Sequence, residues 1–284
     1  MQKVFLIVLA LHLAMITVGQ GKPAYVLYNN KGRKVSYKKM IRELSARDFV
    51  LFGEFHNNPI SHWLQLEVTK DCDQNRDIIL ALEMLEADNQ EAVDMYLAGK
   101  INQKGLDSMA RLWRNYATDY APLVNYARDH SVPVVASNIP RRHASLVFSG
   151  GFAALDSLPE KEKGWIAPLP IAYDSELPGY KKMKAMMPGH GGDNLPRAQA
   201  IKDATMAHFS LKKYQPGQLL IHFNGAYHSD NYEGILWYLR RQAPGLKYAT
   251  ITTVSQKDIN RLEKENRGRA DYIICVDEDM TTTY

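Results

Sequence analysis

Short apolar segments alternate with amphipathic segments along most of this 284-residue chain, and this alternation constrains the fold more than any other feature. The apolar segments are rich in β-branched residues and are bounded by polar residues, glycine or proline, as is typical of strands buried on both faces of a parallel sheet. They occupy residues 48–53, 77–83, 132–137, 218–223, 247–254 and 271–276. The segments between them have helical periodicity and occupy residues 60–72, 87–98, 104–116, 120–130, 140–148, 195–213, 231–242 and 256–266. The alternation predicts an α/β fold with a mostly parallel central sheet flanked by helices.

Two regions depart from the alternation. Residues 23–40 are interpreted as a small hairpin that turns around Asn-Asn-Lys-Gly. Residues 149–194 contain several prolines and no convincing strand, which predicts a helical or irregular insertion that serves as a lid or binding segment or is disordered. Its methionines Met183, Met186 and Met187 suit a flat apolar ligand, although methionines at this spacing also pack helices against a core.

Residues 1–20 carry one positive charge, at Lys3, followed by an apolar run that ends in small and polar residues. This pattern predicts a secretory signal peptide, and the run is short for a membrane span. We therefore expect residues 21–284 to form a single exported domain that is periplasmic, secreted or on the cell surface. Membrane association stays open, although no cysteine follows the run to accept a lipid anchor.

The charges and cysteines exclude several classes of protein. A formal net charge of +4, from 35 basic and 31 acidic residues, is too balanced to indicate nucleic-acid binding. Cys72 and Cys275 are the two cysteines of the chain, so no disulfide framework or cysteine-based zinc site is expected. In an oxidising compartment they either pair or stay free and buried.

The motif G-x-x-H occurs twice, each time directly after an expected strand: Gly53–His56 and Gly225–His228. In parallel α/β folds the carboxyl ends of the strands gather at one edge of the sheet and form the ligand crevice. A glycine at such a position lets the backbone turn sharply and lets another group approach closely. The repeated motif therefore predicts that two distant parts of the chain meet in one crevice.

Polar residues at the other strand ends are expected in the same crevice, which would collect Glu54, His56, Glu83, Asn138, His222, Asn224 and His228. Imidazole and carboxylate donors suit Zn, Mn or Fe, and the candidate metal ligands are His56, Glu83, His222 and His228. The same chemistry suits acid–base catalysis, with or without a metal, by Glu54, His56, Glu83 and His228. Each of these residues also has a purely structural interpretation as a hydrogen-bonded histidine or a capping carboxylate. His190, in the insertion, is a further candidate gate or ligand.

Several spaced motifs resemble the ChaN-like haem-binding uptake family of the Tiki superfamily over roughly residues 40–245: the two G-x-x-H motifs, Glu83 at the end of LALE, NIPRR at 138–142, and AQAIKDATMA at 198–207. The resemblance implies an α/β fold related to erythromycin esterase-like proteins and an exported haem-binding protein that serves iron or haem uptake. It also implies a tyrosine ligand to haem and a homodimer in which two haems pack face to face. Tiki relatives are instead metal-dependent proteases, and their metal-site positions correspond here to His56, Glu83 and His228.

Haem binding requires an iron ligand and partners for the propionates. Ferric haem accepts a phenolate, and the candidate ligands are Tyr116 and Tyr120, with Tyr173 and Tyr180 as rivals. Arg141 and Arg142 are expected to hold the propionates as bidentate donors. A metal-dependent hydrolase that activates water on Mn, Zn or Fe is the alternative function, so whether the chain is an enzyme stays open.

Overall fold

The computed structural model describes residues 22–186 and 191–284. The expected signal peptide at residues 1–20, and Met187 and His190 in the insertion, lie outside the described residues. In the described ranges, no helix combines the length and the apolar character that crossing a membrane requires.

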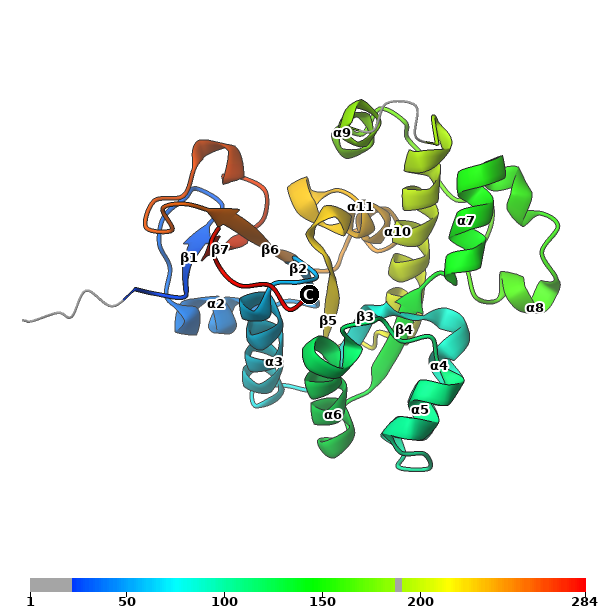
Figure 1. The fold of residues 1–284 in the computed structure, drawn as a ribbon, viewed down its shortest axis with the longest axis horizontal. Helices are drawn as coiled ribbons and strands as arrows, with labels where there is room; N and C mark the ends of the chain where they lie inside the picture. Colours follow the sequence, from blue (N-terminus) through cyan, green and yellow to red (C-terminus); the bar gives the residue numbers. More distant parts are fainter. Residues whose placement is uncertain (1–21, 187–190) are drawn as a thin grey trace, which may run out of the picture.

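Seven strands form one sheet in the order β1-β7-β6-β2-β5-β3-β4, and every neighbouring pair is parallel except β1 and β7. Figure 1 shows this sheet running through the middle of the molecule. The predicted α/β class with a mostly parallel sheet is therefore confirmed. The strands are β1 (Tyr25–Asn29), β2 (Phe49–Glu54), β3 (Ile78–Glu86), β4 (Val134–Asn138), β5 (Leu219–Gly225), β6 (Tyr248–Gln256) and β7 (Tyr272–Asp277).

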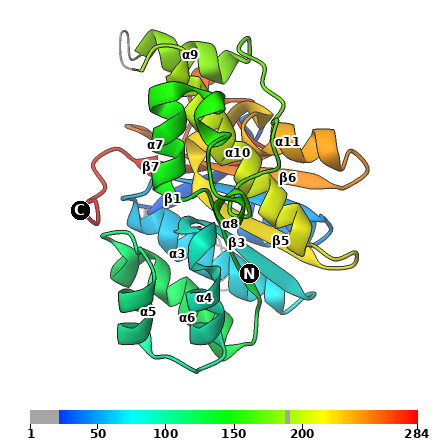
Figure 2. The same ribbon diagram turned by 90° about the vertical axis from the view of Figure 1, so that its right-hand side faces the viewer.

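Helices cover both faces of the sheet, as Figures 1 and 2 show. Alternate residues of β2 point to opposite faces of the sheet. Val50 and Phe52 belong to the buried core on one face, and Phe49 and Leu51 belong to the core on the other. One face carries α2 (Tyr37–Leu44), α3 (Pro59–Asp73), α4 (Gln90–Leu97), α5 (Gln103–Met109) and α6 (Ala121–Asp129). On the other side lie α7 (Arg141–Gly150), α9 (Pro178–Met186), α10 (Asn194–Lys213) and α11 (Ile235–Gln242), and the short α8 (Glu160–Lys163) lies in the insertion.

The small hairpin expected within residues 23–40 forms: β1 turns at residues 29–32, and the chain returns to pair Lys34 with Tyr28 in an antiparallel bridge. The returning arm is short because α2 begins at Tyr37, where the Ser36 side chain caps it by accepting a hydrogen bond from the Lys39 N–H. Two other local predictions were wrong. The helix expected at 104–116 ends at Met109. The helix expected at 256–266 is a loop with a single 3-10 turn, Lys264–Asn266.

The loop after β6 is held by the strand's last side chain. Gln256 is buried, and its amide donates hydrogen bonds to the carbonyls of Asp258 and Arg261, while its carbonyl accepts one from the Glu263 N–H. These bonds satisfy loop backbone groups that a helix would have satisfied internally. Both cysteines are buried and free, so the open question of their pairing is answered for this structure.

Candidate functional site

The two G-x-x-H motifs leave the sheet side by side. Strands β2 and β5 are parallel neighbours, and their register pairs Glu54 with Gly225. The chain of each motif therefore turns away from the sheet at the same level, and His56 and His228 line one cavity of about 590 Å³ at the carboxyl edge of the sheet. We call this hollow the strand-end cavity.

His56 is oriented by the carboxylate of Glu54. The His56 Nδ1 atom lies 2.8 Å from Glu54 Oε1, and Glu54 also accepts hydrogen bonds from the Tyr120 hydroxyl and the Gln65 amide. Burial alone would lower the pKa of His56, but the hydrogen bond to Glu54 and the charge of Glu83 raise it above its ordinary value.

The second nitrogen of His56 is available to a ligand. The His56 side chain is 37% exposed, and its Nε2 atom has no hydrogen bond to any described residue. Because Nδ1 donates to the Glu54 carboxylate in the neutral tautomer, the lone pair of that tautomer is on Nε2.

His228 lies between two buried carboxylates. Its Nε2 atom is 3.2 Å from Glu83 Oε1, and its Nδ1 atom is 2.5 Å from Asp203 Oδ1. Burial alone would lower the pKa of His228, but the charges of Glu83 and Asp203 raise it to about 10. Burial alone would also raise the pKa of Glu83, whereas the charge and hydrogen bond of His228 hold it below its ordinary value. The imidazolium form of His228 is therefore favoured at neutral pH, and each of its ring nitrogens faces a carboxylate.

Asp203 is a site residue that the sequence analysis did not identify. It lies on α10 inside AQAIKDATMA, is fully buried and binds His228. The side-chain amide of Gln199, one helical turn earlier, lies 2.9 Å from Nδ1 of the same imidazole. Two polar residues spaced i, i+4 on a largely buried helix were the available signal. We call Glu54, His56, Glu83, Asp203 and His228 the His-carboxylate cluster.

The side chains of the remaining strand-end residues form hydrogen bonds to neighbouring strands and do not line the cavity. His222 is fully buried, and its ring nitrogens hydrogen bond to Ser137 and Asn224; burial lowers its pKa to about 4, so this imidazole is neutral. Asn138 donates to the backbone carbonyl of Glu83. No three or more His, Cys, Asp or Glu side chains of residues 22–186 and 191–284 are arranged to hold a metal ion. The expected metal set of His56, Glu83, His222 and His228 thus does not form one group here.

The tyrosines expected to bind haem iron are placed unfavourably for that role. Tyr120 is fully buried, and its hydroxyl is committed to Glu54 at 2.5 Å. Tyr116 is also buried, and burial raises the pKa of both phenols, which opposes phenolate formation. Of the rivals, Tyr180 is buried and stacks on Tyr173. None of these four tyrosines lines the strand-end cavity.

Arg141 and Arg142 are likewise not in the cavity wall. Both are exposed at the start of α7, and Arg142 binds Asp88 at 2.7 Å and lies over the Trp165 ring. Of the two propionate partners expected from the sequence, Arg142 is therefore engaged elsewhere on the surface.

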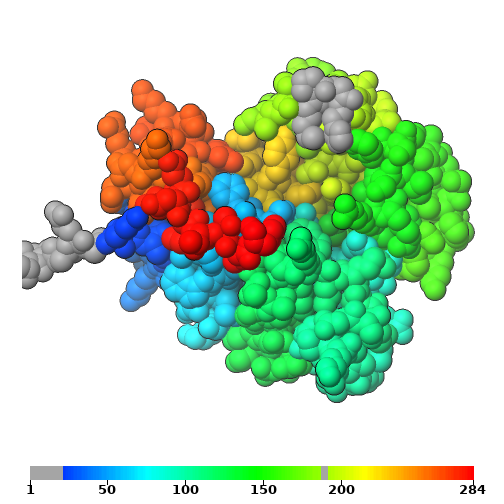
Figure 3. All heavy atoms as spheres, viewed as in Figure 1, coloured from blue at the N-terminus to red at the C-terminus, as the bar shows by residue number. Residues whose placement is uncertain are grey.

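The outer walls of the cavity combine aromatic and apolar side chains with the polar Asn57, Gln199, Asp230 and Arg269. Met183 of α9, Tyr227 and Tyr284 line it together with Arg269. Tyr227 and Tyr284 are 42% and 63% exposed, respectively, unusually high for large aromatic side chains. Tyr284 is positioned by Thr283, whose N–H donates to the Asn57 carbonyl and whose hydroxyl donates to Asp119. Figure 3 shows this last segment, in red, lying across the face of the molecule.

Comparisons with known proteins bear on the family and the fold of the chain. The family described as "Haem-binding uptake, Tiki superfamily, ChaN" matches residues 40–239, and no curated protein matches the chain. A structure described as "Cofacial heme binding to ChaN of Campylobacter jejuni" is similar with a TM-score of 0.67 and 18% identity, covering 90% of this chain and 98% of that one. A Bacillus cereus protein is similar with a TM-score of 0.50 and 12% identity, covering 89% of this chain and 94% of the other. At such identities the structural likenesses show a shared fold.

Proposed function

The chain belongs to the haem-binding uptake family of the Tiki superfamily that includes ChaN, and from this premise we propose that it binds haem in the strand-end cavity and serves iron or haem uptake. The observation that carries the proposal is the Glu54–His56 pair, which presents an oriented imidazole to a cavity with aromatic walls. Bound haem would supply an iron centre that accepts a nitrogen or oxygen donor from the protein.

The chemistry of the cavity suits such a ligand. Haem is a flat, largely apolar ring, and Met183, Tyr227 and Tyr284 offer it a thioether and two aromatic rings. A metal-ligating histidine is commonly oriented by a carboxylate on its other nitrogen, and Glu54 occupies that position relative to His56. We therefore propose His56 as the iron ligand.

Two phenols in the cavity wall are the competing donors. The Tyr227 hydroxyl donates to the Gly179 carbonyl at 2.6 Å. Burial raises the pKa of both Tyr227 and Tyr284, so each is a poorer source of phenolate than a free tyrosine. The pKa of His56 is raised as well, but from an ordinary value of 6.5 rather than 10, which favours the imidazole over both phenols.

A haemin titration tests the proposal. We expect a saturable Soret band in the wild type, a changed band and weaker binding in His56→Ala, and wild-type behaviour in Tyr227→Phe and Tyr284→Phe. The matched control is His130→Ala, because His130 is exposed at the end of α6 and does not line the cavity. A wild type without saturable haemin binding overturns the proposed function, whereas loss of the band in one Tyr→Phe variant reassigns the ligand.

The metal-dependent hydrolase is not developed further, because no observation in this structure favours it. His228 is held as a cation between Glu83 and Asp203, and both nitrogens of His222 are hydrogen bonded inside the sheet. Two of the three histidines expected to bind a metal therefore have no free lone pair directed to the cavity.

Export and dimerisation belong to the same proposal. The composition of residues 1–20 supports export, and N-terminal sequencing of protein recovered outside the cytoplasm tests it. Cofacial haem binding is described for ChaN of Campylobacter jejuni, and we propose that two copies of this chain share their haems similarly. Sedimentation with and without haemin, together with the haem-to-protein ratio, tests this arrangement.

A further inference from the structure

The backbone of His56 is held in place as firmly as its side chain. The His56 carbonyl oxygen lies 3.0 Å from the side-chain nitrogen of Asn115 and 3.0 Å from His62 Nε2. A carbonyl oxygen only accepts, so both nitrogens donate to it. Asn115 and His62 are more than nine-tenths buried, and these two hydrogen bonds are therefore shielded from competing water.

The carboxylate of Asp119 contacts both of these donors. Asp119 Oδ2 accepts a hydrogen bond from the Asn115 amide at 2.6 Å, and it lies 3.5 Å from His62 Nε2. Asp119 is buried in the same π-helical turn as Tyr120, whose hydroxyl donates to Glu54. Two consecutive residues of this turn thus support the proposed iron ligand, one through the carboxylate on its ring and one through the donors on its carbonyl.

The same Asp119 oxygen also holds the segment that carries Tyr284. The Thr283 hydroxyl donates to Asp119 Oδ2 at 2.8 Å, and the Thr283 N–H donates to the Asn57 carbonyl at 3.0 Å. Asn57 and Tyr284 both line the strand-end cavity. We call residues 281–284 the crossing segment; they belong to the red stretch in Figure 3. One carboxylate oxygen therefore joins the support of the iron ligand to a wall of the cavity.

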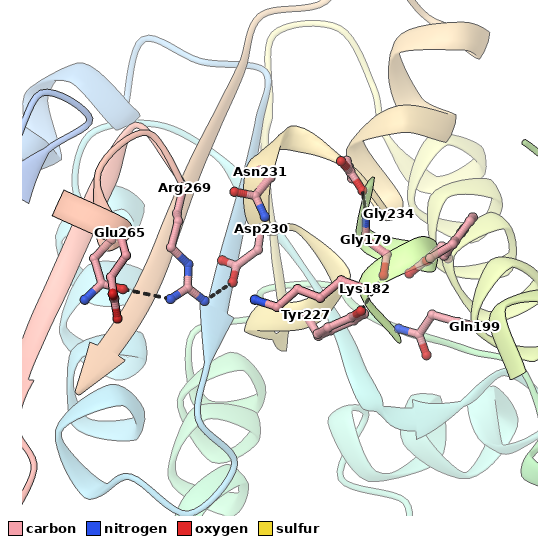
Figure 4. Close-up of a pocket in the computed structure, with 13 residues that line it drawn as sticks. Gly179, Lys182, Gln199, Tyr227, Asp230, Asn231, Gly234, Glu265 and Arg269 are labelled. Atoms are coloured by element: carbon pink, nitrogen blue, oxygen red, sulfur yellow. Dashed lines mark hydrogen bonds and ion pairs between the residues drawn. The ribbon is translucent and has the colours of Figure 1, made fainter. Parts of the chain in front are cut away.

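Another part of the cavity wall has contacts of its own. Arg269 lines the cavity, binds Asp230 and donates a hydrogen bond to Asn266 at 3.0 Å. Figure 4 shows Arg269 and Asp230 where they also line a neighbouring polar pocket of about 400 Å³. The crossing segment differs, because three of its four residues are exposed and Thr283 attaches it to the body of the protein.

We propose that Asp119 is a positioning residue that fixes the iron ligand and closes the cavity at the same time. It holds the His56 carbonyl through the two side-chain donors, and it holds the crossing segment through Thr283. Because Tyr284 lines the cavity, release of the crossing segment from Asp119 opens a path for ligand exchange. The identity of the ligand rests on the proposed function, whereas both arms around Asp119 can be measured in the protein without haem.

The first arm is tested by Thr283→Val, which removes the hydroxyl. We expect roughly tenfold lower protection of the residue 283 amide against hydrogen exchange, the scale of one hydrogen bond to a charged group. Transfer of bound haemin to excess apomyoglobin should be roughly tenfold faster, with the Soret band unchanged. The matched control is Thr281→Val, which alters an exposed residue of the same segment and should change neither quantity.

The second arm is tested by Asn115→Ala. We expect shifted imidazole ¹⁵N signals of His56 in the haem-free protein and a changed Soret band, with the residue 283 amide protected as in the wild type. Asp119→Ala should produce the changes of both arms. Asp119→Asn keeps one acceptor oxygen and should produce smaller changes.

The outcomes separate this inference from the proposed function. If the wild type does not bind haemin, the proposed function fails, and the amide and imidazole measurements still decide whether Asp119 holds both arms. Wild-type amide protection in Thr283→Val, or wild-type His56 signals in Asn115→Ala, overturns the positioning role. Unchanged haemin transfer from Thr283→Val overturns it as well, and so do equal changes in Thr281→Val, because Thr283 is the residue that contacts Asp119.

Discussion

The Nε2 atom of His228 lies 3.2 Å from Glu83 Oε1, and this contact joins β3 to the turn that follows β5. Glu83 also accepts a hydrogen bond from the Gly225 N–H at 2.7 Å, so one carboxylate holds both ends of the second G-x-x-H motif. The base of the strand-end cavity is therefore built from buried charges that compensate one another, and the predictions below test that balance.

His228→Asn should lower the free energy of unfolding by about 3–5 kcal/mol, because it leaves the buried carboxylates of Glu83 and Asp203 without a cation. Urea unfolding at pH 7 measures the change. His130→Asn is the control, since His130 is exposed, and it should cost less than about 0.5 kcal/mol. A loss below about 1 kcal/mol for His228→Asn would contradict a charged His228.

Stability should fall as the pH rises above neutrality. The pKa of His228 is about 10 in the folded protein and 6.5 in the reference state. Between these values the folded state retains a proton that the unfolded state releases. The stabilisation is therefore complete below about pH 6.5 and is lost as the pH rises toward 10, by up to about 1.4 kcal/mol per pH unit.

Urea midpoints measured from pH 7 to pH 9 check this slope. The same series on His228→Asn should be markedly flatter, because the variant lacks the titrating imidazole. Parallel curves for the two proteins would show that another group causes the pH dependence.

The strands could be predicted closely because burial on both faces leaves a continuous apolar run, as in FVLFG and LLIHF. The convergence of His56 and His228 could also be anticipated, since parallel strands end at one edge. It could not be predicted that the two motifs leave neighbouring strands, because this depends on β5 pairing with both β2 and β3 across more than a hundred residues. Strand order is a tertiary property that no local pattern carries.

The roles of individual side chains were harder to predict. Tyr120 was expected to bind haem iron, but five residues of π-helix, Tyr116–Tyr120, turn its hydroxyl inward onto Glu54. Asp203 was not identified, because helical periodicity does not reveal that a polar residue faces a buried partner on another element. The contributions of Arg269 and Tyr284 depend on loops whose paths are set by tertiary contacts.

Replacing the first glycine of each G-x-x-H motif by alanine should affect stability at one position and the orientation of His56 at the other. A Cβ atom on Gly53 would lie 2.9 Å from the Ala226 Cα atom, which is backbone and cannot move away. A Cβ atom on Gly225 would lie 2.8 Å from Cε1 and Nε2 of the partly exposed His56 ring. Gly53→Ala should therefore cost about 1–3 kcal/mol of stability, whereas Gly225→Ala should mainly displace His56.

Urea unfolding and haemin titration of the two variants separate these effects. We expect Gly225→Ala to be the more stable of the two and to show an altered Soret band. A Gly225→Ala protein with an unchanged haemin spectrum would contradict both the close contact with His56 and its proposed role as ligand.

Tyr120→Phe distinguishes the ligand expected from the sequence from the one that the geometry favours. The Tyr120 hydroxyl donates to the buried Glu54 carboxylate, so its removal should cost about 1.5–3 kcal/mol of stability, as for a hydrogen bond to a charged group. Glu54 keeps its hydrogen bonds to His56 and Gln65, and His56 should therefore stay oriented, with an unchanged haemin spectrum.

Tyr126→Phe is the matched control, because it removes a hydroxyl that donates to Asp73 at 2.8 Å in a less buried position, and its cost in stability should be at most about 1 kcal/mol. Loss of the Soret band in Tyr120→Phe, with the fold intact, would instead require the π-helical turn to open so that the phenol reaches the iron.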